Sequence, residues 1–231
     1  DEKGSSAEKT FSVTVETDKF KNSSWVLIKG GSFDMGSTIG DTNETAVHKV
    51  NLKAFWMLKF EVTAENYELC VQNGPCKFTF TNPVEKEKTY GVPSKKQHPV
   101  NYIKWAEARD YCVWIGGDLP TEAQWEYGAK GEKDNRKYPW GDTEPSKSNS
   151  DFANYKNDNY DKFEYTSPVG SFDLKGLSYF GLSDMGGNVK EWVLDHFDSY
   201  LGQSYPTGEV TDPQPTNMTG YLAGARGGSW K

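Results

Sequence analysis

The stretch Gly181-Leu-Ser-Asp-Met-Gly-Gly-Asn-Val-Lys-Glu-Trp192 is the part of the sequence that decides the fold. It lies within residues 132–231, where the sequence shows little regular periodicity and predicts loops and short strands. So long a stretch with little secondary structure is uncommon in a compact domain. We therefore expect an external organiser for these loops, and a bound metal is the natural candidate.

The region before this stretch predicts three helices. Trp105, Ala108, Cys112 and Ile115 are spaced for one face of a helix over 105–115. The next helix follows a capping box at Thr121 and Gln124 and is closed by Gly131, and Thr63 caps a third, short helix.

The N-terminal part predicts strands. Residues 25–28 indicate a buried strand, a glycine turn follows, and a second extended stretch runs to Met35. Residues 48–55 alternate cleanly. Residues 1–24 are expected to be a flexible lead-in with a strand at 11–15.

Composition excludes some classes of protein. The chain has 231 residues, a net charge of -7 and 35% hydrophobic residues. An acidic chain lacks the basic face of a non-specific nucleic-acid binder, so no nucleic-acid partner is expected. The sequence contains no apolar run long enough for a membrane-spanning helix.

Two of the three cysteines are close in sequence. Cys70 and Cys76 bracket a turn, Asn73-Gly-Pro75, that could bring them within disulfide range. A disulfide and two free thiols both remain open at this point. Cys112 is expected to be a small buried hydrophobic residue.

Seven segments follow one another in a recognisable order. They are Gly30-Gly-Ser-Phe-Asp-Met-Gly-Ser37, Phe60-Glu-Val-Thr63, His98-Pro-Val-Asn101, Leu119-Pro-Thr-Glu-Ala-Gln-Trp-Glu-Tyr127, Tyr138-Pro-Trp-Gly-Asp142, Gly181–Trp192 and Arg226-Gly-Gly-Ser-Trp230. In this order they resemble the formylglycine-generating enzyme family, also called the sulfatase-modifying factor domain. The resemblance implies an α+β, C-type-lectin-like fold over residues 25–231, with few helices, short strands and long loops tied by calcium.

The resemblance also implies calcium ligands, which are structural and would stabilise the loops. Side-chain and carbonyl oxygens are the ligands that Ca²⁺ prefers. The positions that match the family's first site are Asn154, Tyr155, Asp161 and Phe163, and those of its second site are Asp184, Gly187, Val189 and Glu191.

The family's oxidases convert a sulfatase cysteine to formylglycine with copper held by two cysteines. Cu(I) requires soft thiolate ligands. The first cysteine of that pair falls one residue beyond Lys231, and Lys190 replaces a tryptophan usual in the enzymes. The family's C-terminal portion supplies core strands, so we expect this part of the domain to be missing from the sequence. These departures favour a member without catalysis over an oxidase that would take its copper ligands from residues beyond Lys231.

The favoured function is therefore a binding module for an extracellular protein or glycan. One branch of this fold comprises surface lipoproteins whose variable residues, diversified by retroelements, follow the Arg226–Trp230 stretch. A similar role implies a cell-surface, periplasmic or secreted location, with a lipid anchor able to precede Asp1. A scaffold protein of an exported assembly is the third alternative. Residues expected near the ligand are Tyr200, Tyr205, Tyr221 and Trp230.

Overall fold

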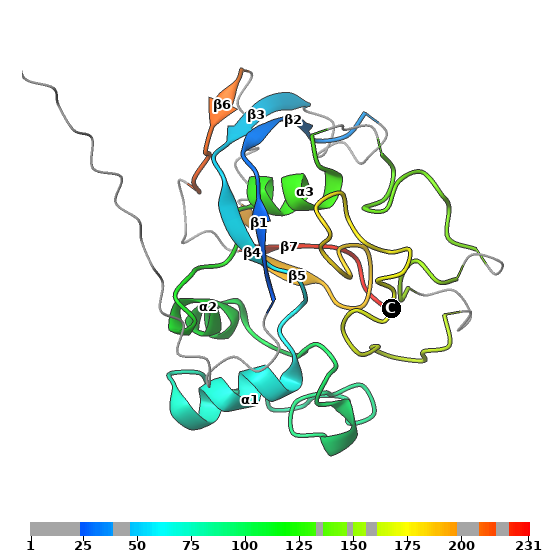
Figure 1. Cartoon of the computed structure of the whole chain (residues 1–231). Coiled ribbons are helices and arrows are strands. Elements are labelled where there is room, and N and C mark those ends of the chain that lie inside the picture. Colours follow the sequence, from blue (N-terminus) through cyan, green and yellow to red (C-terminus); the bar gives the residue numbers. More distant parts are fainter. Residues whose placement is uncertain are drawn as a thin grey trace, which may run out of the picture.

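The structure, a computed structural model, describes residues 24–38, 47–132, 136–146, 150–155, 161–197, 208–215 and 222–231 (Figure 1). The strands are β1 (Trp25–Ile28), β2 (Gly31–Met35), β3 (His48–Leu52), β4 (Phe55–Leu58), β5 (Glu191–Phe197), β6 (Val210–Thr211) and β7 (Leu222–Arg226). The helices are α1 (Ala64–Asn73), α2 (Trp105–Trp114) and α3 (Glu122–Lys130), with a 3₁₀ turn, η1 (Pro93–Lys95). This is the expected α+β architecture of few helices and short strands. The strand expected at 11–15 lies outside the described residues.

The first four strands form one interrupted hairpin. Ile28 lies opposite Phe55 and Gly31 lies opposite Leu52, so the β1–β4 and β2–β3 ladders share one antiparallel register. The expectation of a continuous strand over 48–55 was wrong, because the hairpin breaks at Gly30. A Cβ atom on Gly30 would lie 2.6 Å from the carbonyl oxygen of Leu52, so the two arms of the hairpin approach too closely there for a side chain.

The remaining strands complete two small sheets. β6 pairs parallel with β3, and β5 pairs antiparallel with β7, with a bulge between Trp192 and His196. β7 ends at Arg226, immediately before the Gly227-Gly-Ser-Trp230 segment. The C-terminal segment is thereby held beside the loop that precedes β5, where Trp230 N donates to the carbonyl oxygen of Asn188 at 3.0 Å.

The helix caps follow the sequence. The Thr63 side chain accepts a hydrogen bond from Asn66 N at the start of α1, and Thr121 and Gln124 form the capping box of α3. Gly131 follows α3 with φ +80°. Helix α2 ends at Trp114, one residue before the predicted end. Such caps satisfy N–H groups that the first turn leaves unpaired, which is why they locate helix starts reliably.

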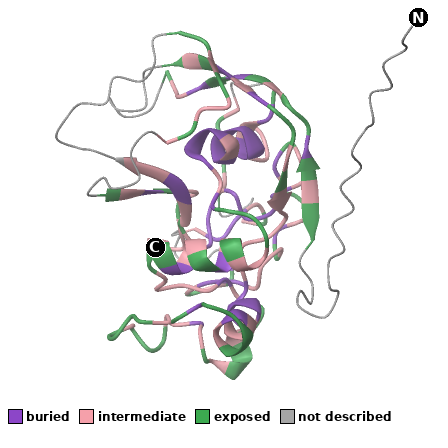
Figure 2. Ribbon diagram, turned by 90° about the vertical axis from the view of Figure 1, so that its left-hand side faces the viewer, coloured by how far each residue is buried: buried purple, intermediate pink, exposed green. Residues whose placement is uncertain are grey.

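Helix α3 lies in the main core, and buried residues concentrate around it (Figure 2). The buried members of this core come from the interrupted hairpin, α3, the 182–185 loop and β5: Ile28, Phe33, Met35, Val50, Leu52, Ala123, Trp125, Tyr127, Ala129, Leu182, Met185 and Val193. A second core lies between α1 and α2 and is centred on Tyr67, Cys70, Cys76 and Tyr111. The loop region of residues 136–190 therefore contributes Leu182 and Met185 to a core whose other buried members come from the hairpin, α3 and β5.

Cys70 and Cys76 are joined by a disulfide, with their Cα atoms 5.4 Å apart. Of the two alternatives that the sequence left open, the structure has the bridged one. Cys112, expected to be a small buried hydrophobic residue, is partly buried and packs against the second core. Among the described residues, no helix is both long and apolar enough to cross a membrane.

Candidate functional site

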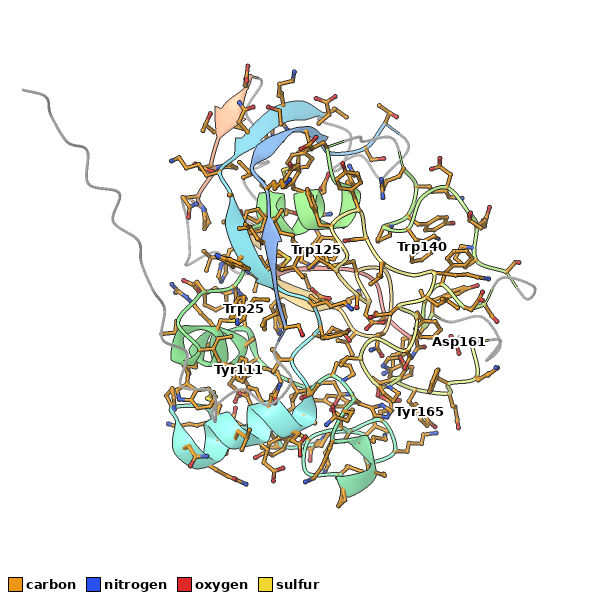
Figure 3. The ribbon with its side chains drawn as sticks, in the orientation of Figure 1. Trp25, Tyr111, Trp125, Trp140, Asp161 and Tyr165 are labelled. Carbon is orange, nitrogen blue, oxygen red and sulfur yellow. A yellow bond between two sulfur atoms is a disulfide. The ribbon has the colours of Figure 1, made fainter. Side chains whose placement is uncertain are left out.

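At the first predicted calcium site, the carboxylate of Asp161 binds the backbone N–H groups of Tyr155 and Phe163, and Asn154 directly precedes Tyr155 in the chain. The Asp161 side chain is only 4% exposed. Its Oδ2 accepts a hydrogen bond from Tyr155 N at 3.0 Å, and its Oδ1 accepts one from Phe163 N at 2.9 Å. One carboxylate thus fastens together two stretches of the loop region, on the side of the molecule away from Trp25 (Figure 3).

Asn154 leaves an acceptor oxygen unused at this place. Its Nδ2 donates to the carbonyl oxygen of Tyr165 at 2.8 Å, whereas its Oδ1 is buried without a hydrogen-bond partner. A buried polar atom without a partner costs free energy and calls for an explanation. An amide oxygen beside a buried carboxylate is a donor set that suits Ca²⁺.

The second predicted site lies on the loop that leads into β5. Asp184 has φ +57°, and its Oδ2 accepts a hydrogen bond from Gly170 N at 2.7 Å. Glu191, the first residue of β5, accepts from the indole Nε1 of Trp125 at 2.8 Å. Gly187 and Val189 lie between these two residues in the sequence; Gly187 is buried and Val189 is partly buried. The loop therefore presents two carboxylates and two backbone carbonyl positions within eight residues.

A third carboxylate, Glu61, belongs to this loop although it lies far away in sequence. Its Oε1 accepts a hydrogen bond from Val189 N at 3.1 Å and its Oε2 accepts one from Asn188 Nδ2 at 2.7 Å. Glu61 occurs in the Phe60–Thr63 segment, which helps to identify the family but predicts no role for this side chain. That segment was the one sequence signal that could have pointed to Glu61. The hydrogen bonds of Glu61 to Asn188 and Val189 cannot be predicted from the sequence.

Burial raises the pKa values of the three carboxyl groups, and neighbouring negative charges raise them further. Burial raises the pKa of Glu61 well above its ordinary value, and the negative charges of Asp184 and Glu191 raise it further. Burial raises the pKa of Glu191 to about 7 and that of Asp184 to about 6. Negative charge so concentrated is stabilised by a cation.

Within the described parts of the chain, no three His, Cys, Asp or Glu side chains are placed to bind one metal ion. The two predicted sites do not need three such groups. Each combines one or two carboxylates with backbone or amide oxygens, which are also hard ligands.

A cavity of about 860 Å³ lies beside the second site. Glu61, Val189 and Glu191 line it at one side. Lys190, at the position where the oxidases carry tryptophan, is exposed and also lines it. Its walls combine aliphatic, polar and aromatic side chains, and the aromatic ones include Trp25, Trp56, Tyr111, Trp125, Trp192 and Trp230 (Figure 3 labels Trp25, Tyr111 and Trp125).

Of the four aromatic residues expected near a ligand, the structure describes Trp230. Its ring meets that of Tyr165 edge to face, with the centroids 5.5 Å apart. The following residue, Lys231, forms an ion pair with Glu87 at 3.0 Å. Tyr200, Tyr205 and Tyr221 lie outside the described residues.

Comparison with known proteins agrees with this architecture. Residues 10–231 match the profile of the family described as the sulfatase-modifying factor enzyme 1-like domain. A protein named serine/threonine-protein kinase pkn1, from Chlamydia pneumoniae, is 32% identical over 224 residues, covering 89% of this chain and 33% of that protein. The formylglycine-generating enzyme of Mus musculus is 31% identical over 189 residues, covering 77% of this chain and 45% of that enzyme. The chain thus spans less than half of either relative.

A solved structure has the same fold. Treponema denticola variable protein 1 superposes with a TM-score of 0.64 at 24% identity, covering 89% of this chain and 83% of that one. At this level of identity the likeness shows the fold alone.

Proposed function

Because the chain belongs to the family of the sulfatase-modifying factor enzyme 1-like domain, we propose that it is a non-catalytic member that binds a protein or glycan ligand outside the cytoplasm. Calcium at two sites would hold its loops in place. The observation that carries the proposal is the cavity of about 860 Å³, lined in part by aromatic side chains, beside the carboxylates of the second site.

The first calcium site is supported by the orphaned oxygen of Asn154. A cation there would give this buried acceptor a partner and would balance the charge of Asp161, which is almost fully buried. Asn154, Asp161 and the carbonyl groups of Tyr155 and Phe163 would hold the ion. Its role would be to tie these loops together.

The second site is supported by the charge of Asp184 and Glu191, with Glu61 beside them. Three carboxyl groups whose pKa values are all raised gain from a nearby divalent cation, because it removes their mutual repulsion. Asp184, Glu191 and the carbonyl groups of Gly187 and Val189 would hold it.

The cysteines of residues 1–231 are unsuited to hold copper, so the oxidase alternative depends on ligands beyond Lys231. Cys70 and Cys76 are joined to each other, and burial raises the pKa of the Cys112 thiol to about 12. Cu(I) needs at least two thiolates in this family, and a thiol with so high a pKa stays protonated at neutral pH. The three cysteines of residues 1–231 therefore offer no thiolate pair for copper.

The cavity has the character of a binding site. Ligand sites are concave and mainly apolar, with a few polar groups that fix orientation. Here aromatic side chains are combined with Lys190 and Ser229. Trp56 is 61% exposed on β4 and gives a ligand an accessible aromatic ring.

The disulfide supports a location outside the cytoplasm. Disulfides persist in oxidising compartments and are rare in the reducing cytosol. The Cys70–Cys76 bridge closes a short surface turn after α1. We therefore place the protein on the cell surface, in the periplasm or in the medium.

The test uses the full-length protein from its natural source, because Trp230 and Lys231, at the end of the sequence, line the cavity. Calcium-loaded protein is applied to an array of defined glycans and to a panel of purified secreted proteins. We expect binding that Trp56→Ala weakens at least tenfold. Leu174→Ala is the matched control, because Leu174 is 91% exposed and does not line the cavity.

Two results would contradict the proposal. One is a ligand whose affinity is equal in wild type and Trp56→Ala. The other is tight Cu(I) binding in a competition titration with a chromophoric chelator, together with oxygen consumption on a sulfatase peptide containing cysteine. The second result would establish the oxidase alternative.

A further inference from the structure

Asn188 occupies the point where the two calcium sites meet. It is fully buried and adopts a left-handed backbone conformation, with φ +59°. Its neighbours in sequence are Gly187 and Val189, both of which belong to the second site. Any movement of Asn188 would therefore move the carbonyl groups on either side of it.

The same residue is bonded to the first site. Asn188 N donates to the carbonyl oxygen of Asn154 at 2.8 Å, and Asn154 Nδ2 lies 3.4 Å from Asn188 Oδ1. Asn188 Oδ1 also accepts a hydrogen bond from Ser167 N at 3.0 Å. Asn154 carries the orphaned oxygen of the first site, so its orientation depends on Asn188.

The remaining polar groups of Asn188 reach outward from the two sites. Its Nδ2 donates to Glu61 Oε2 at 2.7 Å, and lies 3.3 Å from the carbonyl oxygen of Ser167. Its own carbonyl oxygen accepts the hydrogen bond from Trp230 N. Each of its polar groups has a partner on another segment, so this position of Asn188 requires the loops that carry Asn154, Ser167 and Glu61 to be in place together.

We propose that Asn188 couples the two calcium sites, so that an ion bound at either site raises the affinity of the other. This inference rests on the calcium sites of the proposed function. The physical reason is a shared ordering cost: the first ion fixes Asn188 together with Asn154 and Gly187, and the second ion then binds to a loop that is already ordered. Coupling between sites is reciprocal, so each ion must help the other by the same factor.

The test is a calcium titration by calorimetry on the full chain, with one site removed at a time. Asp161→Asn disables the first site and Glu191→Gln disables the second. We expect the surviving site of each variant to bind calcium about tenfold more weakly than the same site does in wild type with the other site filled, within the range typical of coupled sites. The two factors should be equal.

Asn188→Gly tests the role of this residue itself. Glycine tolerates φ +59° without strain, so the substitution removes the side chain and keeps the backbone hydrogen bonds. We expect the coupling factor to fall toward one in this background, while both sites still bind. Hydrogen exchange of residues 184–191 in calcium-loaded Asp161→Asn gives a second readout, in which we expect faster exchange than in wild type. This measurement does not require Asn188→Gly to fold.

The outcomes separate this inference from the proposed function. If wild type binds no calcium, the calcium part of the proposed function fails. If it binds two ions independently, or if the coupling is the same in Asn188→Gly, calcium binding stands and the inference about Asn188 is wrong.

Discussion

The backbone of Gly187 passes directly against the carbonyl group of Asn154. A Cβ atom on residue 187 would lie only 2.4 Å from that oxygen, and Gly187 has φ +149°. The contact brings together two loops that meet between the predicted calcium sites, and it leaves no room for a side chain.

We expect Gly187→Ala to destabilise the fold by about 2–4 kcal/mol, because both the clash and the backbone conformation oppose a side chain. Chemical denaturation measures the loss. Gly181→Ala is the control, since Gly181 also has a positive φ but no atom lies within 4 Å of the position that a Cβ would take, and it should cost about 1 kcal/mol. Equal losses in the two variants would show that the contact with Asn154 is unimportant.

Calcium removal should lower the thermal stability. A site filled at a hundredfold excess over its Kd contributes about 2.7 kcal/mol. For a domain of this size 1 kcal/mol corresponds to about 2–4 °C, so chelation should lower Tm by about 5–10 °C per site. Differential scanning calorimetry with and without EGTA measures the shift.

Asp161→Asn provides the matched comparison for this measurement. It should show a clearly smaller shift on chelation than wild type, because one site is already disabled. The absence of any shift in wild type would refute both sites.

Removing the disulfide should cost about 2 kcal/mol. The two cysteines are six positions apart in the sequence. The chain entropy that the unfolded state loses when so short a loop is closed accounts for a contribution of this size. Cys70→Ser/Cys76→Ser is compared with Cys112→Ala by urea denaturation. Under denaturing, non-reducing conditions one thiol per wild-type chain should titrate, and three would exclude the bridge.

Arg226, at the end of β7, holds together two buried acidic side chains of α3. It forms ion pairs with Glu122 and, at 3.5 Å, with Glu126, and each of these carboxylates is only 8% exposed. Arg226→Met removes the basic partner of Glu122, whereas Glu126 keeps its ion pair with Lys130 at 2.6 Å. The broken buried pair with Glu122 should cost about 2–4 kcal/mol.

Arg109→Met breaks a surface pair with Asp118 and should cost less than about 1 kcal/mol. Similar losses in urea denaturation would contradict this account.

His98 should make stability depend on pH in one direction. Burial, with a smaller contribution from the charge of Lys95, lowers the pKa of His98 below its ordinary value. Between the lowered pKa and the ordinary value near 6.5, the unfolded chain binds a proton that the folded chain does not. The contribution of His98 to stability is therefore complete above about pH 6.5 and is lost as the pH falls through this window.

His98→Gln removes this titration. The variant should lose less stability than wild type between pH 7 and pH 5, measured by denaturation at each pH. Glutamine also keeps a polar group near Thr166 Oγ1, which lies 3.0 Å from His98 Nδ1 in the wild type. Parallel pH profiles would mean that His98 makes no such contribution.

The sequence carried much of the fold because its signals act over short distances. The Thr121–Gln124 capping box and the alternation of residues 48–52 concern neighbours along the chain, and both appear in the structure. The seven ordered segments identified the family. The break after Leu52 was not predicted, because apolar and polar residues go on alternating past it. The break is caused by the close approach of this strand to Gly30, which is a tertiary contact.

The sequence by itself determined the helix caps and the candidate calcium ligands. Only the tertiary structure decided that Glu61 joins the second site from 127 residues away and that Asn188 links it to Asn154. It also decided the Cys70–Cys76 bridge. The physical reason is that local propensities fix conformation within a few residues, whereas contacts between distant loops depend on how the whole core packs.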